Sequence, residues 1–355
     1  MENARRQFIK LGATVAAGAA FSANASANAP GAQEGGAANP IPGEMAPIKG
    51  LRLVTFSPDG RAPARIGAVL ANGRVVDLKA EAGRQSKKLS FDPAQMLSLI
   101  AAGGKGLAEV SALVSKAKGG LQVQNVRLYS PIPAPRANIY CVGWNYLEHF
   151  EEGKDARADK AVASLPEHPV FFSKATHSMN GPFDTIPYDP AVSTLIDWEG
   201  ELAVVIGRRG RNISEKDALD YVYGYSVFND TTARDVQQKR HGGQWFKGKS
   251  LDGHGPMGPW IVTAGELDYD KLHLVTRVNG VVKQDASTGQ MYFKVPKIIA
   301  ELSLGLTLEP GDIIATGTPP GVGFARKPPE FLKPGDVMET EISGIGLIRN
   351  TIQAG

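Results

Sequence analysis

The sequence has one cysteine and almost no net charge, and each shortage excludes a class of protein. A single cysteine in 355 residues excludes an intrachain disulfide framework and a cysteine-based zinc site. Lys and Arg number 39 against 36 Asp and Glu, and no basic stretch is interleaved with aromatic residues. The charge pattern therefore does not indicate a nucleic-acid partner. The 42% hydrophobic content suffices for a sizeable core, and the composition excludes collagen, coiled coil and disorder throughout the chain.

The one cysteine, Cys141, lies in the apolar run 137–142, where it has no charged neighbour. We expect a small buried hydrophobic side chain at this position. A nucleophile is the alternative, but a reactive thiol is usually found beside a basic group that lowers its pKa.

The N-terminal residues have the features of an export signal rather than of a folded element. Arg5 and Arg6 precede a weakly apolar stretch, residues 11–21, that is too short to span a bilayer. Small-residue cleavage sites of the A-x-A type follow, ending at Ala25, Ala27 and Ala29. We predict a twin-arginine (Tat) signal peptide over residues 1–29, transient contact with the twin-arginine export machinery, and a periplasmic location. An amphipathic or disordered N-terminus is the alternative.

The rest of the chain divides into a linker and two predicted domains. Residues 30–49 are rich in Gly, Ala and Pro and predict a flexible linker. Residues 50–130 predict a small α+β domain, because three short strands alternate with turn residues and two helical segments follow. The proline-rich stretch 131–135 marks the boundary with a larger domain over 131–355. The predicted strands of the small domain are 51–56, 65–70 and 75–78, and its predicted helices are 96–102 and 107–116.

The larger domain is rich in strands that do not alternate regularly with helices. This pattern argues against a doubly wound or barrel α/β fold and favours an α+β, β-rich fold with a mixed β-roll or sandwich. The predicted strands include 200–206, 222–228, 257–263, 272–278, 311–316 and 336–342, and the predicted helices are 215–220 and 294–303.

Three carboxylates accompany two of these strands. Glu199 and Glu201 precede or begin an apolar run of strand length, so their side chains point the same way about 7 Å apart. Asp230 ends the next strand along the chain. Carboxylates so placed repel one another unless a cation or a proton lies between them. With no Cys or His ligand nearby, the three favour Mg²⁺ or Mn²⁺, with Ca²⁺ as a further option. The alternative is a solvated acidic face.

A histidine–glutamate pair follows the predicted strand at 139–144. If residues 145–152 are helical, His149 and Glu152 are three positions apart and can touch. A carboxylate that orients an imidazole is a general-base arrangement. The alternative is an incidental pair on a surface helix.

Further polar residues are candidates for binding substrate. Arg234 and Gln237 are three apart just after Asp230, so a helical turn would aim both at one ligand. Lys249 lies between glycine and serine and could steady an anion, or it could be a solvated lysine. Thr318 lies in the Gly/Pro loop 315–324, which lacks the lysine and the following helix of a nucleotide-binding loop but could bind a carboxylate.

Taken together, these segments resemble the fumarylacetoacetate hydrolase family over residues 131–353. The matching motifs, in chain order, are 142–146 with His149 and Glu152, 169–174 with 181–182, 197–201, 229–230, 234–237, 249–250, 255–259 and 316–319. The resemblance implies a mixed β-roll catalytic domain, usually a homodimer, that binds Mg²⁺ or Mn²⁺.

The resemblance also implies roles for single residues. Glu199, Glu201 and Asp230 match the metal-binding carboxylates, and Lys249 matches an active-site lysine. His149 and Glu152 match a lid pair that activates water or shuttles a proton. Arg234 and Gln237 match substrate-side positions of some members, and Asp197 is a candidate to support the ligands from behind.

These residues lead to three functional hypotheses. The first is a divalent-metal-dependent hydrolase that cleaves a C–C bond in acylpyruvates or 1,3-diketo acids through an enolate. The second is an isomerase, an oxaloacetate-type decarboxylase or a ureidoglycolate-type lyase on the same scaffold. The third is a periplasmic protein that binds metal or dicarboxylate without turnover, and it leaves the pair His149 and Glu152 without a purpose.

Overall fold

A computed structural model of the chain describes residues 40, 41, 45, 48, 50–154, 164–265 and 267–355. The predicted signal peptide, residues 1–29, and most of the predicted linker, 30–49, lie outside the described residues. Within the described part of the chain, no helix combines the length and the apolar character that crossing a membrane would require.

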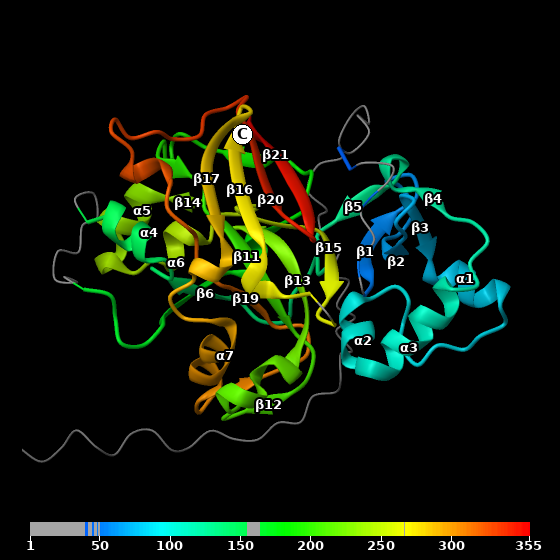
Figure 1. The fold of residues 1–355 in the computed structure, drawn as a ribbon. Coiled ribbons are helices and arrows are strands. Elements are labelled where there is room, and N and C mark those ends of the chain that lie inside the picture. The colour runs from blue at the N-terminus through cyan, green and yellow to red at the C-terminus, as the bar shows by residue number, and fades with distance from the viewer. Residues whose placement is uncertain (1–39, 42–44, 46–47, 49, 155–163, 266) are drawn as a thin grey trace, which may run out of the picture. The chain divides into compact units, whose positions relative to one another are not determined.

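Strands dominate the structure and form two principal sheets (Figure 1). The larger sheet has twelve strands, and β5 and β8 pair with β1 and β15 beside its main path. Along that path its strands are β4 (Leu121–Gln122), β3 (Arg74–Asp77), β2 (Arg65–Val69), β1 (Arg52–Ser57), β15 (Gly255–Thr263), β13 (Val222–Asn229), β11 (Gly200–Ile206), β19 (Ile313–Ala315), β6 (Ile139–Gly143) and β7 (Val170–Lys174), with β5 (Arg127–Tyr129) and β8 (Met179–Asn180) off it.

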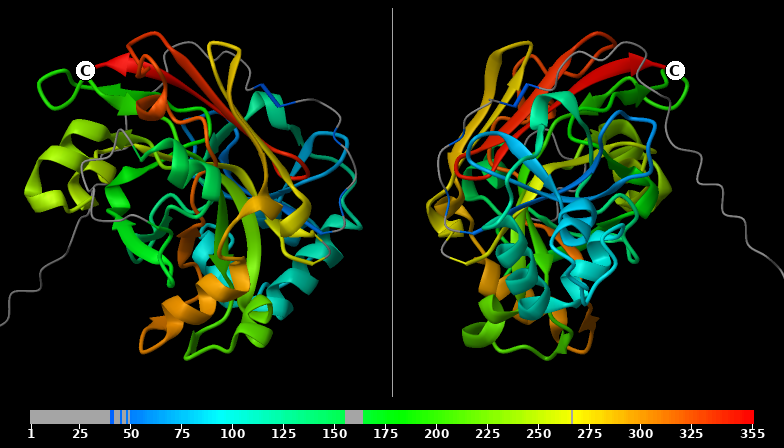
Figure 2. Two further views of the ribbon diagram at one scale, coloured as in Figure 1. Left: turned by 60° about the vertical axis from the view of Figure 1, so that its left-hand side comes forward. Right: turned by 90° about the vertical axis from the view of Figure 1, so that its right-hand side faces the viewer.

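The second sheet has five strands that run alongside one another across β11 and β13 (Figures 1 and 2). In order they are β17 (Val281–Ser287), β16 (His273–Val278), β20 (Val337–Ile342), β21 (Gly346–Ala354) and β9 (Ile186–Tyr188). Two small pairs complete the strands among the described residues, β10 (Ile196–Asp197) with β14 (Thr232–Ala233) and β12 (Gly210–Arg211) with β18 (Thr307–Leu308).

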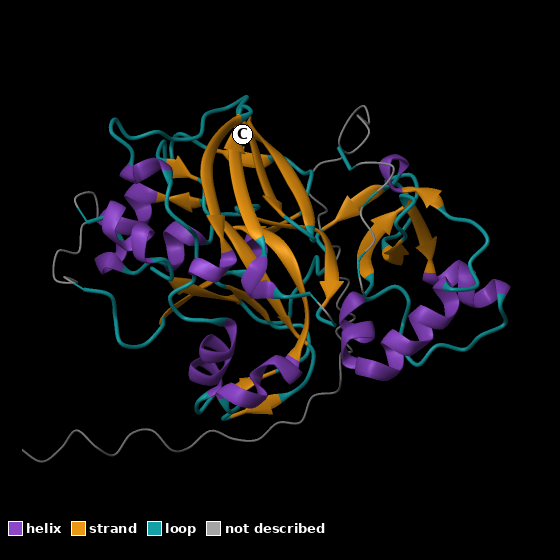
Figure 3. Ribbon diagram, in the orientation of Figure 1, coloured by secondary structure: helices purple, strands orange, loops and turns teal. Residues whose placement is uncertain are grey.

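The helices are short and lie outside the sheets (Figure 3). The α-helices are α1 (Leu78–Arg84), α2 (Met96–Ala101), α3 (Gly103–Val114), α4 (Leu147–Glu152), α5 (Arg234–Lys239), α6 (Phe246–Lys249) and α7 (Val295–Ser303). The 3-10 helices are η1 (Val123–Asn125), η2 (Thr176–Ser178), η3 (Glu215–Tyr221), η4 (His241–Gly243), η5 (Tyr269–Lys271), η6 (Thr288–Gln290) and η7 (Gly323–Ala325).

These elements confirm the predicted α+β, strand-rich fold, with small differences. The segment predicted as a helix at 215–220 is the 3-10 helix η3. The strand predicted at 311–316 is shortened to β19, because a turn from Glu309 to Asp312 occupies the preceding residues and Gly311 has a φ of +93° there. Strand β1 pairs with β15, so the strands of region 50–130 continue the same sheet as those beyond 131. The described residues form one compact unit, and the predicted domain boundary near residue 130 stays a prediction.

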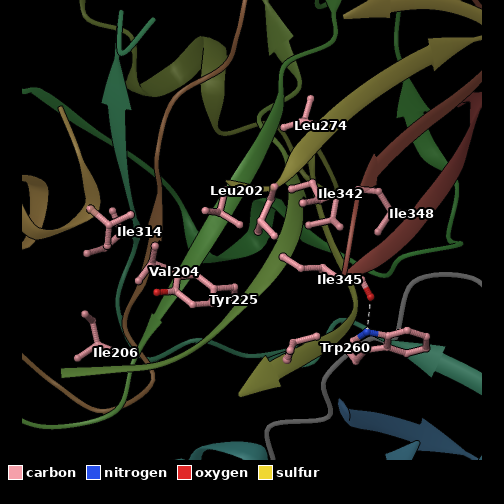
Figure 4. Close-up of a cluster of buried hydrophobic side chains, with 14 of the residues drawn as sticks. Leu202, Val204, Ile206, Tyr225, Trp260, Leu274, Ile314, Ile342, Ile345 and Ile348 are labelled. Atoms are coloured by element: carbon pink, nitrogen blue, oxygen red, sulfur yellow. Dashed lines mark hydrogen bonds between the residues drawn. The ribbon is translucent and has the colours of Figure 1, made fainter. Parts of the chain in front are cut away.

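The main core lies between the two sheets (Figure 4). Leu202 and Val204 of β11 are buried in the same cluster as Leu274 of β16 and Ile342 of β20. At its edge the indole nitrogen of Trp260 donates a 2.7 Å hydrogen bond to a backbone carbonyl, so a polar group enters the core with its partner.

Strand β11 is buried on both faces, and this determines where the candidate carboxylates lie. Its even-numbered residues enter the core between the sheets, whereas Ala203 and Val205 belong to a second cluster with Leu99 and Ile100 of α2. Because alternate side chains share a face, Glu201 points to the same side as Ala203 and Val205. The fold therefore carries an acidic side chain into the interior.

The lone cysteine has the buried position that the sequence predicts. Cys141 lies on β6 and is fully buried, with Ala315 of β19 as its strand partner. Burial raises the pKa of the Cys141 thiol well above its usual range, which disfavours the thiolate that a nucleophile requires.

Candidate active site

The three predicted metal ligands come together at one end of the pair β11 and β13. The antiparallel register places Gly200 opposite Asn229, so the residues just outside each strand are neighbours. The backbone N–H of Asp230 donates a 2.8 Å hydrogen bond to the carbonyl of Glu199. Glu201 is the second residue of β11 and lies beside them.

The carboxylates of Glu199, Glu201 and Asp230 form a buried cluster. One oxygen from each lies within 4.8 Å of the others, and the residues are 5%, 1% and 0% exposed. The alternative of a solvated acidic face is therefore wrong. A closely spaced set of oxygen donors is what a hard divalent cation prefers.

Two cations of the chain itself already contact this cluster. The ammonium of Lys249, at the end of α6, lies 2.6 Å from Oε2 of Glu199 and 2.7 Å from Oδ2 of Asp230. The guanidinium of Arg234, at the start of α5, lies 2.7 Å from Oε1 of Glu199. Lys249 is only 2% exposed, so the alternative of a solvated lysine is also wrong.

A third cation, Lys174, also contacts the cluster, although its sequence context does not mark it as a site residue. It ends β7, it is fully buried, and its ammonium lies 2.8 Å from Oδ1 of Asp230. It also donates a 3.1 Å hydrogen bond to the carbonyl of Thr231. Its place at the end of the motif 169–174 was the one signal in the sequence. A lysine at a strand end is ordinarily solvated, so the residue type alone gives no reason to expect burial.

Asp197 supports the site from behind, as expected. Its Oδ2 accepts a 2.8 Å hydrogen bond from Nε of Arg234 and a 3.0 Å bond from the backbone N–H of Phe324. Its Oδ1 accepts from the backbone N–H of Gly323 at 2.7 Å. One fully buried carboxylate thus fixes both Arg234 and the loop that closes the site.

The charges of this network leave the site one positive charge short. Four buried carboxylates, those of the cluster and of Asp197, face three cations. Burial raises the pKa of Glu201 well above its usual range, and the nearby carboxylates add to this effect. For Glu199, burial acts in the same direction, but Lys249 and Arg234 outweigh it and lower the pKa to about 2. Glu201 is therefore the carboxylate whose charge the chain's own cations compensate least, and the cluster of three fits a divalent metal.

The predicted histidine–glutamate pair is formed on α4. Nδ1 of His149 and Oε1 of Glu152 are 2.9 Å apart, and His149 is 7% exposed, so the alternative of an incidental surface pair is wrong. The other oxygen of Glu152 accepts a 2.8 Å hydrogen bond from the backbone N–H of Gly321. The pair is thereby tied to the loop 315–324.

That loop binds carboxylates, but they belong to the chain itself. Backbone N–H groups of Gly317, Gly321 and Gly323 donate to Glu201, Glu152 and Asp197 at 2.8, 2.8 and 2.7 Å. Gly317 has a φ of +98°, and a Cβ there would lie 2.7 Å from the Cβ of Asn145, so only glycine fits.

Thr318, predicted to bind substrate, lines the cavity of the site. Its hydroxyl donates a 3.0 Å hydrogen bond to the carbonyl of Gly200 and accepts a 2.7 Å bond from Nε2 of Gln284. The hydroxyl proton thus holds the loop against β11, and the substrate role of Thr318 stays a prediction.

A cavity of about 510 Å³ opens over the carboxylate cluster. Its floor contains Glu199, Glu201 and Lys249, and His149 lines it from α4. Gln237 of α5 also lines it, and its Oε1 accepts a 3.2 Å hydrogen bond from Arg234. That bond leaves the amide N–H groups of Gln237 as donors. The structure thus brings the sequence-predicted site residues to one cavity or directly behind it.

Comparison with known proteins gives consistent results. Oxaloacetate tautomerase YisK of Bacillus subtilis (strain 168) is 41% identical over 297 residues, which cover 81% of this chain and 95% of that protein. The mitochondrial oxaloacetate tautomerase fahd2 of Xenopus laevis is 39% identical over 313 residues, 87% of this chain and 92% of that protein.

Two solved structures are also similar to this chain over most of its length. A fumarylacetoacetate hydrolase from psychrophilic Exiguobacterium antarcticum has a TM-score of 0.72 and 40% identity, covering 86% of this chain and 100% of that one. Maleylpyruvate hydrolase from Sphingobium sp. SYK-6, in complex with manganese(II) ion and pyruvate, has a TM-score of 0.65 and 30% identity, covering 86% and 99%. The model of the fumarylacetoacetate (FAA) hydrolase C-terminal family matches residues 138–353. With its buried carboxylates, its contact between His149 and Glu152 and these similarities, the chain belongs to the fumarylacetoacetate hydrolase family of enzymes.

Proposed function

We propose that the protein is a divalent-metal-dependent enzyme that interconverts the keto and enol forms of a 2-oxo acid such as oxaloacetate. The observation that carries the proposal is the buried cluster of Glu199, Glu201 and Asp230 beneath a cavity that His149 also lines. Proton transfer at carbon needs both a stabiliser of negative charge and a base, and these residues supply the two functions. The names of the two tautomerase relatives support the choice of reaction.

Glu199, Glu201 and Asp230 would hold Mg²⁺ or Mn²⁺. When bound, such an ion polarises the oxygens of a 2-oxo acid and so lowers the cost of forming an enolate. The solved relative that contains manganese(II) and pyruvate supports this combination of ion and ligand class.

His149 is the proposed base. When its Nδ1–H donates to Glu152, the lone pair of Nε2 is available to accept a proton from the carbon next to the keto group. Because Glu152 is itself fixed by the backbone of Gly321, the imidazole is held in one orientation. Return of the same proton to the enolate oxygen or to carbon completes the interconversion.

Lys249 and Gln237 are the proposed groups for binding the substrate anion. Burial by itself would lower the pKa of Lys249, but Asp230 and Glu199 outweigh it and the pKa is raised, so the side chain carries its positive charge. A charged donor beside the cavity floor steadies negative charge that develops on the substrate. The free N–H groups of Gln237 suit a carboxylate oxygen.

A second candidate reaction is the hydrolysis of a C–C bond in an acylpyruvate. The observation that favours it is again the contact of His149 with Glu152, since an oriented base can deprotonate a water as well as a carbon acid. The two reactions differ in their products, so one assay separates them.

The test is a substrate panel on protein stripped with a chelator and reloaded with Mn²⁺. We expect catalysed loss of the enol absorbance of oxaloacetate only with metal. In a separate control assay with an acylpyruvate as substrate, we expect little formation of pyruvate. His149→Gln should bind substrate but lose turnover. Formation of pyruvate from an acylpyruvate, with no effect on the oxaloacetate enol, would select the hydrolase instead. Full activity after chelation would overturn both proposals.

We also propose that residues 1–29 direct export to the periplasm by the twin-arginine route and that the mature protein is a homodimer. The paired Arg5 and Arg6 support the first statement, and the family resemblance supports the second. Cell fractionation of the chain and of Arg5→Lys/Arg6→Lys tests export, and light scattering of the purified protein tests the dimer. Unchanged export of the double variant would contradict the first proposal.

A further inference from the structure

One wall of the active-site cavity is built from aromatic side chains. Trp144, Phe172, Trp245 and Phe324 all line it, and each is only half-buried. Four large rings that are left partly open to one cavity form an apolar surface suited to an apolar ligand. The cavity of about 510 Å³ is also of the size that encloses drug-sized ligands, well beyond what a four-carbon diacid needs.

Trp245 is held rigidly in this wall. Its ring packs edge-to-face on Phe172 and on Trp144, with centroids 5.1 Å apart in both pairs. A Cβ on Gly143 would lie 2.6 Å from the indole, so the backbone at the end of β6 lies against the ring. Trp144 has a φ of 54°, a conformation that bulky residues rarely adopt and that is often found where a ligand is held. The wall is therefore preorganised.

The wall adjoins the charged floor directly. The ammonium of Lys249 lies 5.1 Å from the centroid of Phe172, and the guanidinium of Arg234 lies 4.2 Å from that of Phe324. Both cations are already paired with carboxylates of the cluster. The described residues that line the cavity carry no charge apart from Glu199, Glu201, Arg234, Lys249 and, when protonated, His149.

We infer that the preferred substrates are 2-oxo acids with an uncharged aryl group on the third carbon, that is, arylpyruvates. The 2-oxo acid head fits the charged floor, and the ring fits against Trp245 and Phe172. The inference rests on the proposed tautomerase function. In the reaction a proton leaves the third carbon, a C=C bond forms to the keto carbon, and the keto oxygen takes up a proton, so no further reactant is needed.

The experiment compares phenylpyruvate with oxaloacetate on the Mn²⁺-loaded protein. We expect catalysed tautomerisation of both, with a higher kcat/KM for phenylpyruvate. Trp245→Ala should raise KM for phenylpyruvate about tenfold, as expected for loss of an aromatic contact, and change that for oxaloacetate less than about twofold. Phe172→Leu, a milder change, should act in the same direction if Trp245→Ala fails to fold. Phe246→Ala is the matched control, because this neighbouring ring is 45% exposed and lies outside the cavity lining.

The outcomes separate the inference from the proposed function. Turnover of oxaloacetate without phenylpyruvate, or equal losses for both substrates in Trp245→Ala, would overturn the inference and leave the function standing. If neither acid is turned over, the proposed function fails and the substrate preference fails with it, and calorimetric titration with phenylpyruvate then tests only whether the aromatic wall binds an aryl ligand. Mn²⁺-dependent binding that weakens about tenfold in Trp245→Ala would then support the aromatic wall as a ligand site, and absence of binding would overturn it.

Discussion

Glu201→Gln separates the metal-binding role of the carboxylate cluster from its role in the fold. The amide keeps the shape of the side chain and can still accept the 2.8 Å hydrogen bond from Gly317. What it removes is a negative charge that is disfavoured in the metal-free protein, because burial and the neighbouring carboxylates raise the pKa of Glu201. Without metal, we therefore expect the variant to be as stable as the wild type to within about 1 kcal/mol.

With metal, the two proteins should differ clearly. At a free Mn²⁺ concentration of about 100 times Kd, binding stabilises the wild type by about 2.7 kcal/mol. If loss of one anionic ligand weakens binding about a hundredfold, the same Mn²⁺ concentration stabilises the variant by only about 0.4 kcal/mol. At roughly 2 °C per kcal/mol, the expected Tm increases are about 5 °C and about 1 °C.

Thermal unfolding with and without Mn²⁺ measures this difference. Glu309→Gln is the matched control, because it removes an exposed carboxylate whose partner, Arg209, is also exposed. It should keep the full metal-dependent shift. An unreduced shift in Glu201→Gln would remove Glu201 from the ligand set. A loss of more than about 2 kcal/mol in the metal-free variant would refute the reasoning about its charge.

Three other predictions follow from the structure. Lys174→Met leaves Asp230 without one of its buried partners and should reduce the free energy of unfolding in urea by about 3 kcal/mol, whereas a loss below about 1 kcal/mol would show that the pair is dispensable. Gly317→Ala should weaken Mn²⁺ binding measured by calorimetry, because both the positive φ and the contact with Asn145 force the loop to move, and wild-type affinity would contradict this. Burial lowers the pKa of His254 to about 4 from 6.5. Between these pH values the unfolded chain therefore binds more protons at His254 than the folded chain does. The contribution of His254 to the free energy of unfolding should thus fall by about 3 kcal/mol as the pH drops from 6.5 to 4. Urea unfolding over this range should show a shallower pH dependence for His254→Gln, and parallel curves would refute the assignment.

Much of the fold could be read from local patterns. The apolar run of β11 and the alternation in β1, β2 and β3 depend on residues close in sequence, and the structure has strands at these places. The order of strands could not be read in this way. Strand β15 lies between β1 and β13, and β19 pairs in parallel with β6, and such pairings depend on packing between distant segments.

The candidate site divides along the same line. The sequence by itself predicted that Glu199 and Glu201 share a face of a strand and that His149 can reach Glu152, because strand and helix periodicity fix which nearby side chains share a face. The register of β11 with β13 then brought Asp230 to the two glutamates. Only the tertiary structure decided that Lys174 and Lys249 are buried against those carboxylates, and that Trp144 and Trp245 meet in one wall. The physical reason is that a side chain's burial and partners are set by segments that pack on it from elsewhere in the chain, and these leave no periodic trace in its own neighbourhood.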